Sequence, residues 1–207
     1  MKKWIFLALI FAAALPCHAA FSADGAVVTN VQGGPEIIRS GTTHPAAVGM
    51  SCQKDDILKT SPGCMLDVSV NGLAGCRLLE SSECSLMATE KNSMQLKVTQ
   101  GNMVLNLAKL PGESVFRLET PTAVASVRGT QFWGRVNTKQ ADNPVTTFAV
   151  REGKVEILDK VSKRSFNLEK GQALDIPKDP SAAPSVRAAL AGEMQAMEQA
   201  NVIKITA

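Results

Sequence analysis

The chain has 207 residues, of which 45% are apolar and 20% charged, and its formal net charge is +3. This composition is typical of one globular domain and excludes a disordered chain or a protein with several membrane spans. Two of the positive charges, Lys2 and Lys3, lie in the N-terminal leader described next, so the remaining chain carries a net charge of about +1. So small a charge excludes a basic footprint for nucleic acid or an anionic membrane.

The N-terminus has the three parts of a secretory signal peptide. Lys2 and Lys3 precede an apolar run over residues 4–15, and the segment Pro-Cys-His-Ala at 16–19 offers a cleavage site. We therefore expect a signal peptide over residues 1–19 and a periplasmic or secreted protein. The run is too short for a stable membrane span, which takes about 20 residues. The alternative is a lipid anchor on Cys17, which the preceding Pro16 disfavours because a small residue is needed there.

Four cysteines remain after the leader, namely Cys52, Cys64, Cys76 and Cys84. An even number in an oxidising compartment favours two disulfides, for which three connectivities are possible. Sequential pairing, Cys52 with Cys64 and Cys76 with Cys84, is the arrangement we favour. The alternative is a zinc site, but the spacings contain no CxxC pair and His44 is the one histidine outside the leader. We expect no metal and no cofactor.

Residues 27–176 have the pattern of an all-β domain, with short apolar stretches broken by glycine and polar turn residues. Apolar and polar residues alternate over 94–98, 104–107, 115–119 and 155–158, and each segment is predicted to be a strand with one buried face. A shared pattern of strand, glycine and strand occurs at 28–33, 98–104 and 150–155. It fits either ordinary hairpins or strand-turn-strand units that stack. We predict a two-layer β-sandwich or a roll that resembles a solenoid.

The composition changes after Ile176. Residues 177–184 are rich in proline and are predicted to be a linker. A C-terminal amphipathic helix is predicted over 185–200, with Ser185 as its N-cap and an apolar stripe of Val186, Leu190, Met194 and Met197. We expect this helix to cover a face or edge of the β-domain, and the alternative is a partner-binding or dimerising helix.

The residue inventory outside the leader is poor in catalytic groups, with one histidine and no tyrosine. His44 lies in a loop-like segment and is expected to be solvated. The adjacent carboxylates Asp55 and Asp56 precede an apolar stretch and fit a turn before a strand, although a glycosidase-type pair is the alternative. We expect no catalytic residues and a protein that is not an enzyme.

The most distinctive segment is residues 116–132, Phe-Arg-Leu-Glu-Thr-Pro-Thr-Ala-Val-Ala-Ser-Val-Arg-Gly-Thr-Gln-Phe. Two elements follow in order, Val-Arg-Glu-Gly-Lys-Val at 150–155 and Leu-Glu-Lys-Gly-Gln-Ala at 168–173. Upstream, Gly49 precedes Asp-Asp-Ile-Leu-Lys-Thr at 55–60. Together these elements closely resemble the FecR domain family over residues 27–176. The residues that carry the family motif are Thr120, Pro121, Arg128, Gly129, Thr130, Glu152, Gly153 and Gly171.

The resemblance implies a regulatory role. The best-known FecR proteins span a membrane, and their periplasmic region relays an iron-siderophore signal to a cytoplasmic sigma factor. This sequence has no cytoplasmic region before its apolar segment and no spanning helix, so we expect an exported, non-enzymatic binding or signalling module. Its partner would be another envelope protein, for example a receptor or a membrane regulator. The alternative is a structural protein that binds envelope glycan or peptidoglycan.

The motif also has a direct physical interpretation. Pro121 fixes φ and favours an extended Thr120, which indicates the end of a strand. We expect the Arg128 guanidinium to act as an internal clamp that ties two strands together, the alternative being contact with an external ligand. Phe132, Trp133 and Phe148 are predicted to lie in the core.

Overall fold

The structure of the protein, a computed structural model, describes residues 25–90, 92–139 and 142–205. The predicted signal peptide and Cys17 lie outside these ranges. No helix in the described part of the chain is long and apolar enough to cross a membrane. The described elements are β1 (Ala26–Gln32), β2 (Glu36–Arg39), β3 (Thr42–Pro45), β4 (Ser51–Cys52), β5 (Ile57–Lys59), β6 (Met65–Val70), β7 (Ala74–Leu78), β8 (Glu83–Glu90), β9 (Ser93–Leu107), β10 (Val115–Glu119), β11 (Ala123–Val127), β12 (Gln131–Asn137), β13 (Val145–Glu152), β14 (Lys154–Asp159), β15 (Ser165–Glu169), β16 (Gln172–Pro177), β17 (Ser185–Ala188), the helix α1 (Ala191–Glu198) and the 3-10 turn η1 (Gln199–Val202).

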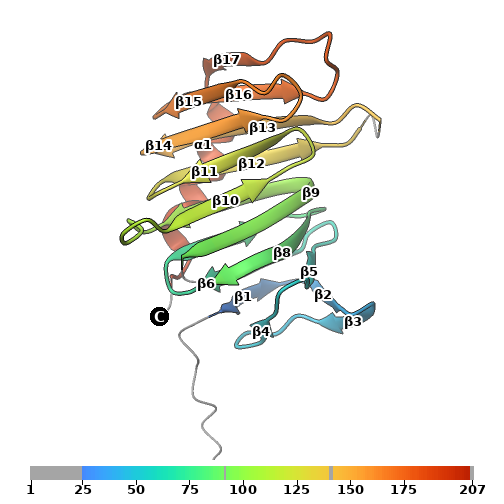
Figure 1. Ribbon diagram of the computed structural model, residues 1–207. Helices are drawn as coiled ribbons and strands as arrows, with labels where there is room; N and C mark the ends of the chain where they lie inside the picture. The colour runs from blue at the N-terminus through green and yellow to red at the C-terminus, as the bar shows by residue number, and fades with distance from the viewer. Residues whose placement is uncertain (1–24, 91, 140–141, 206–207) are drawn as a thin grey trace, which may run out of the picture.

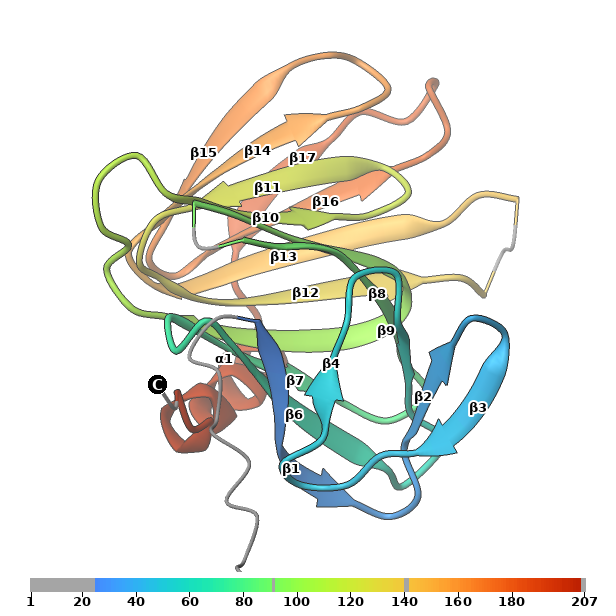
Figure 2. The same cartoon turned by 60° about the horizontal axis from the view of Figure 1, so that its bottom comes forward.

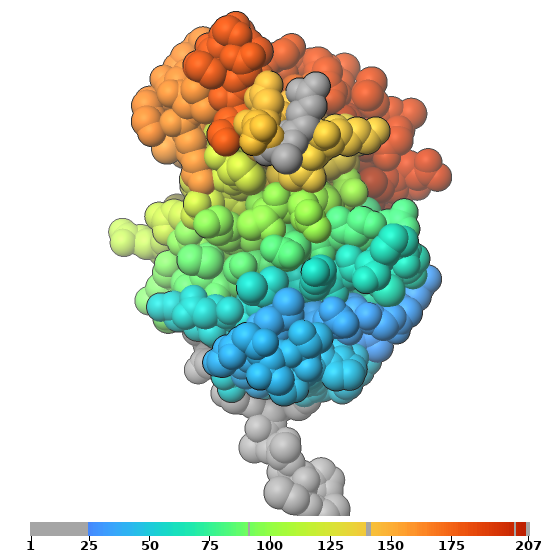
Figure 3. Space-filling view, turned by 90° about the vertical axis from the view of Figure 1, so that its right-hand side faces the viewer, coloured from blue at the N-terminus to red at the C-terminus, as the bar shows by residue number. Residues whose placement is uncertain are grey.

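The strands form one continuous sheet that is folded into two layers (Figure 1). The front sheet has the strand order β3-β2-β5-β8-β9-β10-β11-β14-β15. The back sheet has the order β4-β1-β6-β7-β9-β12-β13-β16-β17. Figure 3 shows that chain order runs along the stack, from N-terminal residues at one end to the last strands at the other. The expected all-β, two-layer fold is confirmed.

Strand β9 belongs to both layers. Its first half pairs with β8 and β10 in the front sheet, and its second half, from Gly101 onward, pairs with β7 and β12 in the back sheet. The chain bends at Gly101, where φ is +85° and an added Cβ would lie 2.3 Å from the Ser82 hydroxyl. Only glycine fits such a corner. Strand β10 then runs parallel to the start of β9, with Val115 beside Ser93, so this part of the chain completes one solenoid-like coil.

The three strand-glycine-strand segments of the sequence mark crossings between the sheets. Gly33 connects β1 in the back sheet to β2 in the front sheet, Gly101 joins the two halves of β9, and Gly153 connects β13 in the back sheet to β14 in the front sheet. These segments are therefore not hairpin turns within one sheet. They are the corners at which strands of the two layers are linked, as the stacking interpretation predicted.

The main core lies between the two sheets. Phe116 from the front sheet and Phe132 and Phe148 from the back sheet are fully buried there. The alternation of polar and apolar residues in the sequence of β14 matches this core, because its residues are alternately exposed and buried along the whole strand. Trp133, the neighbour of Phe132, points to the opposite face of the back sheet and joins a second apolar cluster.

The geometry of β1 excludes the expected Cys52–Cys64 disulfide. Cys52 lies beside Ala26 at the start of β1, whereas Cys64 directly precedes β6, whose first residue lies beside Gln32 at the end of β1. The length of β1 places the two cysteines about 20 Å apart. Disulfide-bonded Cα atoms lie at most about 7 Å apart. The predicted sequential pairing is therefore wrong for Cys52 and Cys64.

All four cysteines in the described residues are free thiols, so the predicted Cys76–Cys84 disulfide is not formed in the structure either. Cys76 on β7 and Cys84 on β8 are both buried in the core, and burial raises the pKa of each thiol, to which the nearby Cys84 adds for Cys76. Burial likewise raises the pKa of Cys52 to about 12. The three buried thiols, Cys52, Cys76 and Cys84, therefore behave as small apolar side chains.

The C-terminal helix α1 covers the outer face of the back sheet (Figure 2). Met197, Ala200 and Ile203 pack on an apolar patch to which Val104 and Trp133 belong. The remaining members of this back-sheet patch are Ala149 and Ala173. A short helix gains most of its stability from such packing, and the expectation of a helix that covers the β-domain agrees with this arrangement.

The start of the predicted helix is wrong. Residues 185–188 form β17, which pairs with β16 at the edge of the back sheet. The proline-rich residues 178–184 are thus a loop between two strands. Val186 and Leu190 of the predicted apolar stripe are 48% and 60% exposed, and only Met197 is fully buried. Residues 185–188 therefore form backbone hydrogen bonds with the free edge of β16, although the spacing of their apolar side chains is helical.

Arg187 fastens the helix to the sheet. Its Nε donates to Asp175 Oδ2 on β16 at 2.6 Å, and its two terminal nitrogens donate to the Glu193 carboxylate of α1 at 2.9 and 2.6 Å. Glu193 also accepts the backbone N–H of Leu190 at 2.8 Å, which caps the start of the helix. At the other end, Arg151 on β13 donates to the Met197 carbonyl at 3.0 Å.

The Arg187–Glu193 contact predicts that the helix loosens in acid. The hydrogen bond from Arg187 holds the pKa of Glu193 below its usual range, against the opposing effect of burial. A lowered pKa in the folded state stabilises the fold above the unfolded-state value of about 4.3 and ceases to do so as the pH falls through the folded-state pKa. Below about pH 4 the Trp133 emission should therefore shift to the red before global unfolding.

This measurement is made on the chain without residues 1–19, in which Trp133 is the one tryptophan. The variant Glu193→Gln should show the red-shifted emission already at neutral pH and lose about 1 to 2 kcal/mol of unfolding free energy. An emission spectrum of the unsubstituted protein that stays constant until the whole protein unfolds would contradict the role given to this contact.

Candidate functional site

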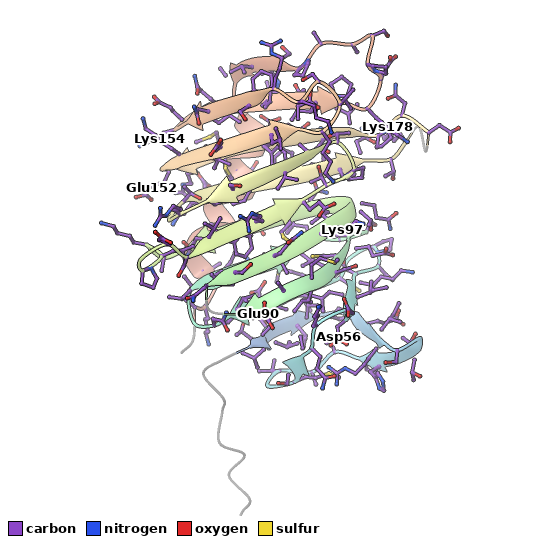
Figure 4. The ribbon with its side chains drawn as sticks, viewed as in Figure 1. Asp56, Glu90, Lys97, Glu152, Lys154 and Lys178 are labelled. Carbon is purple, nitrogen blue, oxygen red and sulfur yellow. The ribbon has the colours of Figure 1, made fainter. Side chains whose placement is uncertain are left out.

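Most of the motif residues lie at one edge of the two-layer stack, where the chain crosses between sheets. Arg128, Gly129 and Thr130 connect β11 in the front sheet to β12 in the back sheet, and Glu152 and Gly153 connect β13 to β14. Figure 4 shows Glu152 and Lys154 at this edge, with Lys97 and Lys178 at the opposite one. The fold thus gathers segments that are well separated in sequence.

An open cleft of about 450 Å³ lies between these crossings. We call it the motif cleft, and its lining residues are Asn106, Leu107, Lys109, Arg128, Gly129, Thr130, Gln131 and Glu152. Lys109, Arg128 and Glu152 are exposed, whereas Asn106 and Gln131 are half-buried. The cleft therefore offers two cations, one anion and two amides, which can bind a partner by charge and hydrogen bonding.

Gly153 allows the two crossings to touch. Its φ is +85°, and an added Cβ would lie 2.5 Å from Thr130 Cγ2 and 2.8 Å from the Gly129 carbonyl oxygen. The Glu152–Gly153 turn therefore packs directly against the Gly129–Thr130 backbone, and any side chain at Gly153 would push the crossings apart. The motif pairs these glycines because the backbones must approach closely.

Thr130 has an unusual environment. The residue is 4% exposed, and its hydroxyl makes no hydrogen bond with any described residue. Its carbonyl accepts the N–H of Leu107 at 2.9 Å, which anchors the crossing to the end of β9. Buried hydroxyls normally have a partner. The cleft wall thus holds a polar group whose hydrogen-bonding capacity the described protein leaves unused.

Arg128 is not the internal clamp that the sequence predicted. Its side chain is exposed, and its guanidinium donates to the carbonyl of Gly112 in the loop between β9 and β10. It therefore braces a loop beside the motif cleft and does not tie strands together in the interior. The crossing places Arg128 outside because the buried alternate positions of β11 end at Val127.

The comparison with protein families agrees with this arrangement. The model of the FecR protein family matches residues 56–156. Residues 56–156 therefore carry a FecR domain. The matched region runs from the start of β5 into β14 and includes every residue of the Arg128 and Glu152 crossings.

The fold of the FecR domain also occurs in solved structures. Two crystal structures of a candidate anti-sigma factor from Parabacteroides distasonis, at 1.65 and 2.50 Å resolution, superpose on the chain with TM-scores of 0.57 and 0.58. The sequences are 16% identical, and the match covers 69% of this chain and 64% of each solved chain. No curated protein sequence matches the chain. At this identity the likeness establishes the fold.

Thr120 and Pro121 of the motif lie at the other edge, in the turn between β10 and β11. Thr120 is buried, and its hydroxyl accepts from the Thr146 hydroxyl at 3.0 Å. Thr146 in turn accepts from the Thr122 hydroxyl at 2.7 Å. Because Thr146 lies on β13 in the back sheet, this chain of hydroxyls connects the two layers through the interior. The predicted strand end at Thr120 is thus also a link between the layers of the FecR domain.

The arginine that acts as a buried clamp is Arg77, which sequence analysis missed. Its Nε and one terminal nitrogen donate to the two carboxylate oxygens of Asp67, both at 2.7 Å. The side chains of Arg77 and Asp67 are 7% and 2% exposed, and they join β7 to β6. The only sequence signal was a charge within each apolar strand. Likewise, nothing in the sequence around Lys109 indicated that it would border the motif cleft.

The residues considered for catalysis do not form a catalytic arrangement. His44 lies half-buried on the edge strand β3. Asp56 is buried and accepts two short hydrogen bonds from Arg39, at 2.9 and 2.6 Å. Burial raises the pKa of Asp56, but the bonds from Arg39 and from the Gln53 N–H outweigh it and hold the pKa below its usual range. A glycosidase acid needs the opposite shift. Within the described ranges, no cluster of His, Cys, Asp and Glu could hold a metal.

The two arginines should differ sharply in their effect on stability. Arg128→Ala should leave the free energy of unfolding nearly unchanged, because the side chain is exposed. Arg77→Ala should lower it by about 3 to 5 kcal/mol, because it leaves the Asp67 carboxylate buried and unpaired. Urea denaturation measures both. If Arg128→Ala proved as destabilising as Arg77→Ala, the exposed position of Arg128 would be wrong.

The close contact at Gly153 predicts a second difference. Gly153→Ala and Gly171→Ala both place a side chain at positive φ, +85° and +80°, which costs about 1 to 2 kcal/mol. Only Gly153→Ala also meets atoms, because nothing lies within 4 Å of a Cβ at Gly171. Gly153→Ala should therefore be more destabilising by at least about 1 kcal/mol in urea titrations. Equal losses would mean that the two crossings do not touch.

Proposed function

We propose that this protein is an exported, non-enzymatic regulatory module that works by binding another protein of the cell envelope. Membership of the FecR family supports a regulatory role. The observation that carries the proposal is the motif cleft, because it places the exposed charges of the motif residues Arg128 and Glu152 on one open surface, together with Lys109. Such groups suit recognition of a polar protein surface.

Export is proposed from the sequence of residues 1–19. The two lysines, the apolar run and the small residues before Ala20 are the features that a signal peptidase requires. The mature protein would then begin at Ala20 and reach its partner in the periplasm or outside the cell. A receptor or a membrane regulator is the class of partner that the family suggests.

A protein partner is favoured over a glycan by the positions of the aromatic side chains. Sugars are usually bound on exposed aromatic rings. In the described ranges, Phe116, Phe132, Phe148 and Trp133 are at most 4% exposed. The fifth ring, Phe166, is half-buried, and the Arg164 guanidinium lies over it at 5.3 Å. The described residues therefore provide no aromatic platform on which a sugar could stack.

Position-specific photocrosslinking in cells tests the proposal. A photoreactive amino acid at Lys109 or at Glu152, on either side of the motif cleft, should give the same crosslinked envelope protein. The matched control is Lys178, which lies at the opposite edge of the stack (Figure 4) and should not give this product. The charge reversal Arg128→Glu should reduce the product at Lys109 by about tenfold.

The intact mass of the recovered protein, measured in the same experiment, should correspond to a chain that begins at Ala20. A chain that retains residues 1–19 would contradict export. Crosslinks of equal yield from Lys178, or crosslinks to cell-wall material alone, would contradict recognition of a protein through the motif cleft.

A further inference from the structure

Both sheets end at the same end of the stack, in β15 at the front and β17 at the back (Figure 1). Among the described residues, β15 pairs with β14 and β17 pairs with β16, and neither has a partner on its other side. An unpaired edge presents backbone groups on which another strand can add. None of the residues that line the motif cleft belongs to β15 or β17, so this edge is a second surface that could bind a partner.

The register of β15 identifies the free backbone groups. Asp159 N–H donates to the Arg164 carbonyl at 2.9 Å, which makes these residues a hydrogen-bonded pair. Because such pairs alternate along an antiparallel ladder, the N–H and C=O of Ser165 and Asn167 point away from β14. Glu169 faces the same way, and its N–H donates to Gln172 Oε1 at 2.8 Å. Ser165 and Asn167 therefore form the open part of this edge.

Apolar side chains at this end are incompletely covered. Leu158, beside Ser165 in the ladder, is 41% exposed, and Val161 in the β14–β15 turn is 37% exposed. On β17, Val186 lies beside the buried Leu174 and so faces the core, yet it is 48% exposed. Phe166 of β15 is half-buried. An added strand would extend the core beside Phe166 and Val186, whereas Leu158 lies on the outer face of the front sheet with the other exposed residues of β14.

The charges around β15 define the chemistry of the occupant. Lys163 and Arg164 precede the strand and Lys170 follows it, and all three are exposed. The one acid of the strand, Glu169, is already paired with Lys154 at 2.7 Å. The edge therefore has an excess of positive charge. A second copy of the chain would bring the same positive charge to this edge, whereas an acidic segment would be attracted.

We propose that the β15 edge binds an extended acidic segment of a partner protein as an added β-strand. The backbone of Ser165 and Asn167 supplies the ladder hydrogen bonds. Apolar residues at alternate positions of the segment pack on the exposed part of Phe166, beside the Arg164 guanidinium that lies over its ring, and its carboxylates lie near Lys163, Arg164 and Lys170. This binding uses neither Arg128 nor Glu152, so it does not depend on the function proposed for the motif cleft.

Blocked synthetic peptides of alternating residues, matched in length to β15, provide the test. A valine-glutamate peptide should bind the full protein at least about tenfold more tightly than a valine-lysine peptide in titration calorimetry. Its binding should weaken with added salt. In hydrogen exchange, the amides of Ser165 and Asn167 should exchange quickly in the free protein and become protected in the complex.

Two variants separate backbone pairing from charge. Asn167→Pro removes an N–H that points away from β14, so the hairpin is retained while binding should fall by about tenfold. Should Asn167→Pro fail to fold, the charge reversals Lys163→Glu and Lys170→Glu together should invert the preference between the two peptides. The control Glu152→Gln should bind the acidic peptide as the unsubstituted protein does. Equal affinity for both peptides, or no protection at Ser165 and Asn167, would overturn the proposal and leave the motif cleft unaffected.

Discussion

The architecture depends on one constraint, which is that the chain must pass repeatedly between two packed sheets without leaving space at the corners. Packed sheets lie about 10 Å apart, and each crossing has only a few residues in which to span that gap. Gly101 and Gly153 meet the constraint by adopting positive φ in direct contact with the neighbouring corner. The shared strand β9 then holds the two layers as a single body, and the hydroxyl chain through Thr146 links them again at the opposite edge.

The same constraint explains how a motif of structural residues can also define a surface. A tight crossing leaves no room in the interior for the side chains that flank its glycine. Arg128 and Glu152, which flank Gly129 and Gly153, are therefore exposed, and both line the motif cleft. Most residues of the FecR motif therefore lie at crossings between the two sheets. The motif cleft lies where the β11–β12 crossing packs against the β13–β14 crossing.

Sequence analysis predicted the parts of the fold that follow from local pattern. Alternation located the strands, as in β14, and glycine located the corners, because both are consequences of backbone geometry within a few residues. It failed where the outcome depended on distant partners. The helical spacing of Val186, Leu190 and Met194 predicts a helix that begins at residue 185, but residues 185–188 pair with the open edge of β16 as a strand. Arg128 was placed inside and Arg77 was overlooked, because burial of an arginine is decided by a carboxylate such as Asp67 on another strand.

The position of α1 after all the described strands has a consequence for the order of assembly. The apolar patch of the back sheet, with Trp133 at its centre, is built from β9, β12, β13 and β16, which all precede the helix. While the protein is being synthesised or refolded, the two sheets can pair before anything is available to cover this patch. Chains shortened before Met197 would keep it open to water and to one another. Docking of α1 is therefore a late step of folding, which buries the apolar patch after the two sheets have formed.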